Sequence, residues 1–158
     1  LNETVMRVVE SMQATFTMRN VQISWMPLQS LPPLRHDPDA VSQCVGNLLS
    51  NAAKYSDGEV WIGITVRRVA HGIEVVVSDK GIGISPSDMQ QIFEPFFRSK
   101  TNEARKRKGT GIGLAITKHI MDSHGGKVIV QSRLGEGSSF ILRFPFDLID
   151  TEGVDQIV

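Results

Sequence analysis

Apolar residues recur at helical spacing in several segments of the chain, and these segments predict amphipathic helices. Asp37 and Pro38 suit the N-cap and the first turn of one of them. The stretch Ser56-Asp57-Gly58 is a suitable stop for the same helix. The expected helices cover residues 1–20, 38 to about 56, 85–92 and 111 to about 124.

Runs rich in β-branched residues, bounded by turn residues, predict strands between these helices. The expected strands are 21–27, 59–69, 72–79 and the two halves of a hairpin over 127–145. The mixture indicates an α+β protein, a two-layer sandwich with helices on one face of a mixed, mostly antiparallel sheet. We expect residues 1–146 to form one domain and the acidic tail, 147–158, to be loose.

Composition narrows the class of protein. The chain has 158 residues, 41% hydrophobic and 22% charged, with no net charge, so nothing in the total favours nucleic acid or an acidic membrane surface as a partner. The single cysteine, Cys44, excludes a disulfide framework, and a buried thiol is its simplest interpretation. No apolar run approaches the roughly 20 residues of a membrane span. Because the first residue is Leu rather than Met, we expect an excerpt or a processed product of a longer protein.

A polar ridge accompanies the apolar stripe of the helix at 38–56. Asn47 and Asn51 are four residues apart and share a face, and Lys54 and Tyr55 follow. This ridge could be the solvent face of the helix. Asparagine is a mediocre helix former, however, and amide oxygens suit Mg²⁺, which needs few protein ligands.

A glycine-rich elbow follows the strand at 72–79. Asp79 ends the strand, and Gly81 and Gly83 let the backbone come close to a ligand. A tight turn with a local Asp79 hydrogen bond explains the pattern equally well. Alternatively, the carboxylate could accept a hydrogen bond from an exocyclic amino group such as that of adenine.

Three further glycines, Gly109, Gly111 and Gly113, precede the helix that starts near residue 111. Exposed backbone N–H groups at a helix start favour an anion, most simply a phosphate. A phosphate-binding loop of the form G-x-x-x-x-G-K-[ST] is absent, as are the H-R-D and D-F-G motifs of the Ser/Thr/Tyr kinases. The run does not follow a strand, which disfavours a dinucleotide-binding fold.

Taken together, these stretches resemble the ATP-binding catalytic domain of bacterial sensor histidine kinases, in the GHKL superfamily. "NLLSNAAKYS" resembles the N box, "DKGIGI" the G1 box, "IFEPFFR" the F box and "GTGIGLAI" the G2 box. "GGKVIVQSRLGEGSSFILRFP" resembles the closing hairpin of the family. The order and spacing of all these motifs are far more specific than any one of them.

The resemblance implies a role for each motif residue. Asn51 would coordinate Mg²⁺ with support from Asn47, and Lys54 would meet phosphate. Asp79 would bind the adenine amino group, with a water shared by Gly83. The remaining nucleotide contacts would come from Tyr55, Gly81, Gly109, Thr110, Gly111, Ile112, Gly113, Leu114 and, on the adenine side, Ser138.

The basic run 98–108, with six basic residues and one acidic residue, would form a lid over the phosphates, or would be only a solvated loop. Arg98 would approach the terminal phosphates. Phe93 and Phe96 would anchor the base of the lid to the core. We expect the lid to become ordered when nucleotide binds.

The implied activity is that of an ATP-dependent protein-histidine kinase. In the related gyrase and mismatch-repair ATPases, the N-box position that matches Asn47 resembles a water-activating glutamate. An amide such as that of Asn47 has no useful basicity near neutral pH. Asn47, Lys54 and Arg98 would therefore serve phosphoryl transfer rather than hydrolysis. A nucleotide-binding scaffold without transfer, or a GHKL ATPase, remains an alternative.

The implied partners are a histidine-bearing dimerisation domain of the same full-length protein and, indirectly, a response regulator. None of the four histidines fits the acceptor, since His36-Asp37-Pro38 only imitates the acceptor motif and sits where a helix cap is needed. We expect a cytoplasmic domain without nucleic acid or direct membrane contact, whether or not the full-length protein is membrane-anchored.

Overall fold

The computed structural model describes residues 1–32, 34–99, 101, 104 and 106–146. The predicted tail, 147–158, and part of the predicted lid lie outside the described residues. The helices are α1 (Asn2–Met18), α2 (Pro38–Lys54), α3 (Pro86–Met89) and α5 (Gly113–Ser123). The strands are β1 (Val21–Met26), β2 (Val60–Val69), β3 (Gly72–Asp79), β4 (Lys127–Arg133) and β5 (Gly137–Pro145).

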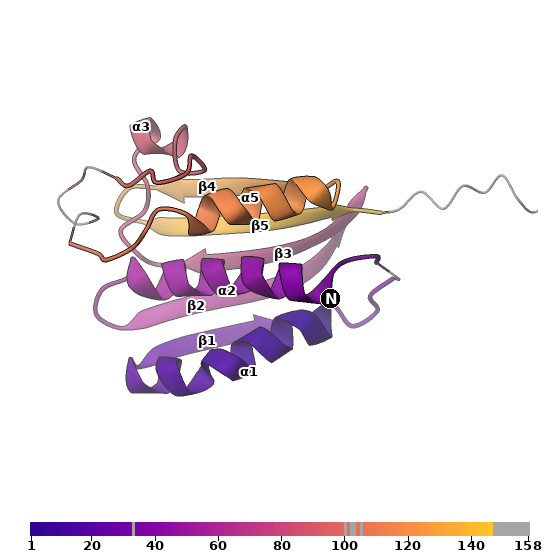
Figure 1. The fold of residues 1–158 in the computed structure, drawn as a ribbon. Helices are drawn as coiled ribbons and strands as arrows, with labels where there is room; N and C mark the ends of the chain where they lie inside the picture. The colour runs from indigo at the N-terminus through magenta and orange to yellow at the C-terminus, as the bar shows by residue number, and fades with distance from the viewer. Residues whose placement is uncertain (33, 100, 102–103, 105, 147–158) are drawn as a thin grey trace, which may run out of the picture.

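The five strands form one mixed sheet in the order β1-β2-β3-β5-β4. β1 pairs with β2 in parallel, through the crossover helix α2, and every other pair is antiparallel. Helices α1, α2 and α5 lie across one face of this sheet (Figure 1). The predicted two-layer α+β sandwich is therefore confirmed.

The core lies between the three helices and that face. In the centre of the sheet Val75 is opposite Val66 on one side and Leu142 on the other, and all three are buried. Helix α2 covers them with the apolar stripe predicted from the sequence, since Val41, Leu48 and Leu49 are at most 1% exposed. Cys44 belongs to the same stripe, and burial raises the pKa of its thiol to about 11.

Helix α2 begins where Asp37 and Pro38 predict. One carboxylate oxygen of Asp37 accepts hydrogen bonds from the N–H groups of Asp39 and Ala40, at 2.9 and 3.1 Å. These hydrogen bonds lower the pKa of Asp37 below its ordinary value. The segment His36-Asp37-Pro38 is thus a helix cap, as expected.

Two expectations for the segment after β3 are wrong. Helix α3 ends at Met89, and turns rather than helix continue through Ile92. Phe96 does not anchor the lid, because its side chain is 74% exposed. Its φ of 64° belongs to the left-handed region, and the reversal directs the next residue, Phe97, into a pocket.

The opposite face of the sheet, which none of the described helices covers in Figure 1, carries a charged cluster. Glu74 on β3 lies between Arg67 on β2 and Arg143 on β5, with N···O distances of 2.6 to 2.9 Å. Burial beneath the two guanidinium groups opposes ionisation of Glu74, yet hydrogen bonds and charge from both arginines outweigh it and lower its pKa.

Candidate functional site

A pocket lies at the end of the sheet where α2 and β3 finish. The cavity encloses about 110 Å³. Its walls combine apolar side chains with a few polar groups, as is usual for small-molecule sites. The lining residues are Asn51, Tyr55, Asp79, Ile82, Gly83, Ile84, Ser85, Asp88, Ile92, Phe97, Arg98, Ser99, Thr101, Ala104, Leu114, Leu134, Ser138 and Phe140.

Asp79 supplies a carboxylate to this pocket. One of its oxygens accepts hydrogen bonds from the N–H groups of Gly81, at 2.8 Å, and Ser138, at 3.3 Å. Burial raises the pKa of Asp79, because desolvation outweighs the two hydrogen bonds. The predicted local turn and the predicted pocket carboxylate are therefore both present.

The elbow after Asp79 is packed too tightly for side chains. A Cβ atom on Gly81 would collide with the Tyr55 carbonyl, and one on Gly83 with the Arg133 carbonyl. Gly83 also has a φ of 68°, which glycine adopts without strain. The two glycines thus allow the elbow to join the end of α2 to the β4–β5 hairpin at the pocket wall.

The polar ridge of α2 faces the glycine run before α5. The side-chain amide of Asn47 donates to the Gly113 carbonyl, at 3.1 Å, and lies 3.4 Å from the Thr117 hydroxyl. The Lys54 ammonium lies directly beside Gly109 and 4.6 Å from the centre of the Tyr55 ring. The ridge is therefore not a solvent face, since it contacts a second predicted motif.

The start of α5 leaves backbone donors available to a ligand. Ile112 is the N-cap, and no side chain makes a capping hydrogen bond there. Just before it, Gly111 has a φ of 74° and lies so close to the Phe97 carbonyl that a Cβ would be 2.5 Å from it. An uncapped helix start carries a partial positive charge.

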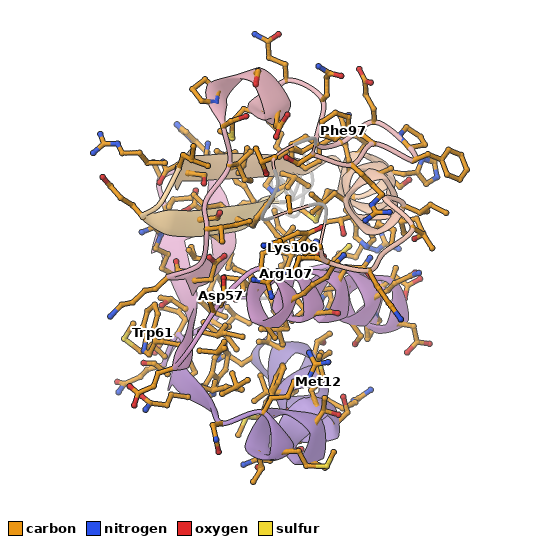
Figure 2. The ribbon with its side chains drawn as sticks, turned by 90° about the vertical axis from the view of Figure 1, so that its left-hand side faces the viewer. Met12, Asp57, Trp61, Phe97, Lys106 and Arg107 are labelled. Atoms are coloured by element: carbon orange, nitrogen blue, oxygen red, sulfur yellow. The ribbon has the colours of Figure 1, made fainter. Side chains whose placement is uncertain are left out.

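Arginines from the basic run lie near the pocket mouth. The guanidinium of Arg98 donates to the Arg107 carbonyl at 2.7 Å. Arg107 in turn forms an ion pair with Asp57, just beyond the end of α2 (Figure 2). These contacts fasten one end of the predicted lid beside α2.

The structure brings many of the predicted site residues into one region. Those that line the pocket are Asn51, Tyr55, Asp79, Gly83, Arg98, Leu114 and Ser138. Asn47, Lys54 and the glycines at 81, 109, 111 and 113 do not line the pocket, but they contact one another or residues that do line it. Thr110 and Ile112 are not among the lining residues.

Sequence reasoning missed several lining residues. The sequence predicts a role for Phe96 and none for Phe97, because no local pattern shows which of two adjacent phenylalanines faces the pocket. Ile84 and Phe140 read as ordinary strand or loop hydrophobics. Ser132 does not line the pocket, but its hydroxyl contacts that of the lining residue Ser138 at 2.9 Å, and the sequence does not distinguish it from any polar residue of a hairpin strand.

Comparison with known proteins identifies the family. The profile of the histidine kinase-, DNA gyrase B-, and HSP90-like ATPases matches residues 36–148, which is more than half of the chain. The sensor-like histidine kinase SenX3 of Mycobacterium tuberculosis is 41% identical over 109 residues, covering 69% of this chain and 27% of SenX3. The chain therefore spans about a quarter of the length of this relative.

Solved structures agree with that match. The catalytic domain of the histidine kinase ThkA superposes with a TM-score of 0.79 at 28% identity, covering 92% of this chain and 93% of ThkA's. Full-length ShkA in complex with AMPPNP gives 0.77 at 27% identity, over 91% of this chain and 29% of ShkA. ThkA has also been solved in complex with the response regulator protein TrrA. The matched chain of that complex gives a TM-score of 0.75 at 26% identity, and the match covers 92% of the present chain and 40% of the matched one. The chain belongs to the family of histidine kinase-, DNA gyrase B-, and HSP90-like ATPases, and its relatives place it among the catalytic domains of sensor histidine kinases.

Proposed function

We propose that this domain binds Mg-ATP and transfers the γ-phosphoryl group to a histidine on a helical dimerisation domain of its full-length protein. The observation that supports it most is the meeting of α2, the Asp79 elbow and the glycine run around one pocket. These three segments are far apart in the chain, so the requirements of turns and helix ends within each segment do not explain why their polar and glycine residues meet at one pocket.

At the inner end of the pocket, Asp79 is assigned to the exocyclic amino group of adenine. A half-buried carboxylate whose pKa is raised by desolvation gains from a donor that replaces lost water. Tyr55 and Ser138 line the same cavity and are assigned to the base as well. Gly83 lets this part of the wall pack against the β4–β5 hairpin, because any side chain there would collide with the Arg133 carbonyl.

At the outer end, Lys54 and the backbone N–H groups of Gly109 to Leu114 are assigned to the phosphates. Lys54 is placed for this role beside Gly109, and Leu114 reaches the pocket. Arg98 at the mouth would add positive charge near the terminal phosphate.

Asn51 is assigned as the protein ligand of Mg²⁺, which would neutralise charge on the phosphates. Within the described residues no group of three His, Cys, Asp or Glu side chains could hold a metal ion. A donor set of one amide fits a cation that keeps several waters and takes its other ligands from phosphates. The Asn47 amide, tied to the Gly113 carbonyl, would hold α2 and the start of α5 in register around that site.

Phosphoryl transfer is favoured over hydrolysis because Asn47 offers no base to a water molecule. The acceptor must come from elsewhere, since no histidine lines the pocket and two of the four have structural partners. The ring of His36 contacts the Thr4 hydroxyl at 3.0 Å, and that of His124 accepts a hydrogen bond from the Asp37 N–H at 3.0 Å.

A response regulator is the proposed final acceptor, in line with the ThkA complex. A cytoplasmic location goes with this proposal, because the site would need cytoplasmic ATP. No helix among the described residues has the length and hydropathy to cross a membrane.

Phosphotransfer from labelled ATP to the cognate histidine-hairpin fragment tests the proposal. We expect labelled hairpin in the presence of Mg²⁺ and none when the acceptor histidine is replaced. ATP binding without transfer would favour a scaffold, and rapid phosphate release without a hairpin would favour an ATPase.

A further inference from the structure

Three side chains lie in a row across the sheet at the pocket. In the pairing register Asp79 on β3 is opposite Ser138 on β5, and Ser138 is opposite Ser132 on β4. Directly opposed residues project from the same face of a sheet. All three therefore point toward the helix-covered side, where Asp79 and Ser138 line the pocket and Ser132 stands behind them.

The hydrogen bonds of Ser132 determine where its proton lies. A serine hydroxyl has one proton to donate and two lone pairs to accept with. The Ser132 hydroxyl lies 2.8 Å from the Gly137 carbonyl, which can only accept, so the proton of Ser132 is directed there. It also accepts from the Ile84 N–H at 2.9 Å.

One lone pair of Ser132 remains, and the Ser138 hydroxyl lies 2.9 Å away. Because the proton of Ser132 is already committed, Ser138 must be the donor in that contact. The oxygen of Ser138 then turns only lone pairs toward the pocket. The ionised carboxylate of Asp79 likewise offers only acceptors.

We propose that Ser132 is a positioning residue for base selection: by taking the proton of Ser138, it makes this edge of the pocket accept hydrogen bonds only, which selects a 6-amino purine over a 6-oxo purine. The inference rests on the proposed nucleotide-binding function and adds a residue that does not line the pocket. Without Ser132, the Ser138 hydroxyl can turn and donate to a carbonyl at position 6.

The test compares the affinities of the whole chain for Mg-ATP and Mg-ITP, measured by isothermal titration calorimetry. In ITP the amino group at position 6 is replaced by a carbonyl oxygen. We expect Ser132→Ala to lower the preference for ATP over ITP roughly two- to twelve-fold, the equivalent of one ordinary hydrogen bond. Ser132→Cys fills the original space with a weak hydrogen-bonding group and should do the same, which covers the case in which the alanine variant does not fold.

Two controls separate this effect from general loosening. Ser132→Thr keeps the hydroxyl and should keep the ATP preference. Ser139→Ala removes a neighbouring hydroxyl on β5 that bonds Ser78, at 2.7 Å, on the opposite face of the sheet, and should also leave the preference unchanged.

An unchanged ATP/ITP ratio in folded Ser132→Ala or Ser132→Cys would overturn the proposal while leaving nucleotide binding intact. So would an equal drop in Ser139→Ala. Failure of the wild-type chain to bind either nucleotide would instead overturn the proposed function.

Discussion

Replacing Asp79 by asparagine separates what its carboxylate does for the fold from what it does for a ligand. The amide keeps an oxygen for the N–H groups of Gly81 and Ser138, which Asp79 now bonds at 2.8 and 3.3 Å. The substitution removes a half-buried negative charge and places a donor where the pocket now offers an acceptor. We therefore expect Asp79→Asn to fold well and to bind Mg-ATP poorly.

The size of the effect follows from one charge-assisted hydrogen bond. Its loss costs about 1.5–3 kcal/mol, so Kd should rise roughly 10- to 150-fold. With nucleotide at one hundred times the wild-type Kd, binding stabilises the wild type by about 2.7 kcal/mol and the variant by only about 0.3–1.4 kcal/mol. A thermal-shift titration with Mg-ATP measures this difference directly.

The pH dependence of the ligand-free proteins provides a second readout. The pKa of Asp79 is raised in the folded state, so the native protein holds this proton to higher pH than the unfolded chain. Its contribution to stability is full below the unfolded pKa, about 3.9, and is lost as pH rises through the raised folded pKa. Relative to Asp79→Asn, the wild type should therefore lose stability over that interval.

Asp122→Asn serves as the matched control, because among the described residues Asp122 forms its ion pair with Lys118, on the exposed side of α5. It should leave the nucleotide-induced shift unchanged. If Asp79→Asn bound Mg-ATP as tightly as the wild type, the assignment of Asp79 to the base would be wrong.

Three further outcomes are expected. Asp57→Asn should increase amide hydrogen exchange at 106–109 by up to about fivefold, since it breaks the partly exposed ion pair between Asp57 and Arg107. If exchange there were no faster than in Asp122→Asn, this ion pair would not be what holds the segment beside α2. Glu74→Gln should lower the free energy of unfolding in urea by about 1–2 kcal/mol at neutral pH, because it removes the charge that both arginines bind. The loss is modest because the two arginines are half-exposed and solvent screens the interaction. That loss should become smaller as the pH falls from about 4.3, the ordinary pKa of a glutamate, through the lowered pKa of Glu74. A loss that does not depend on pH would refute the view that the ionised Glu74 carboxylate stabilises the fold through its two arginines. Cys44, whose thiol pKa is about 11, should resist thiol reagents at pH 8 until the protein unfolds, and labelling of the native protein would show that it is not buried.

Local signals predicted the elements well where each depends on its own residues. Helix α2 was placed from the Asp37 cap and its apolar stripe, and both depend on neighbours in the chain. The order of strands could not be obtained in that way, because the parallel pairing of β1 with β2 and the placement of β5 between β3 and β4 depend on packing across the whole sheet.

The candidate site was predictable in its motifs but not in its supporting contacts. Asp79 and the glycines were found because their residue types are unusual where they stand. Ser132 bonds Ile84 across 48 residues, and Arg107 pairs with Asp57 across 50, so neither contact leaves a local pattern. The exposure of Phe96 could not be predicted, because its left-handed backbone, which places Phe97 rather than Phe96 in the pocket, leaves no signal in the sequence.

Most of the residues that line the pocket lie outside the buried core. Among the described lining residues, Phe140 belongs to the core cluster, and Ile84, Ile92 and Leu114 pack against it. Substitutions that abolish ligand binding can therefore accumulate at one end of the sheet while the helix-covered centre keeps the chain folded. The architecture thus allows a variant that has lost its catalytic activity to remain a stably folded domain.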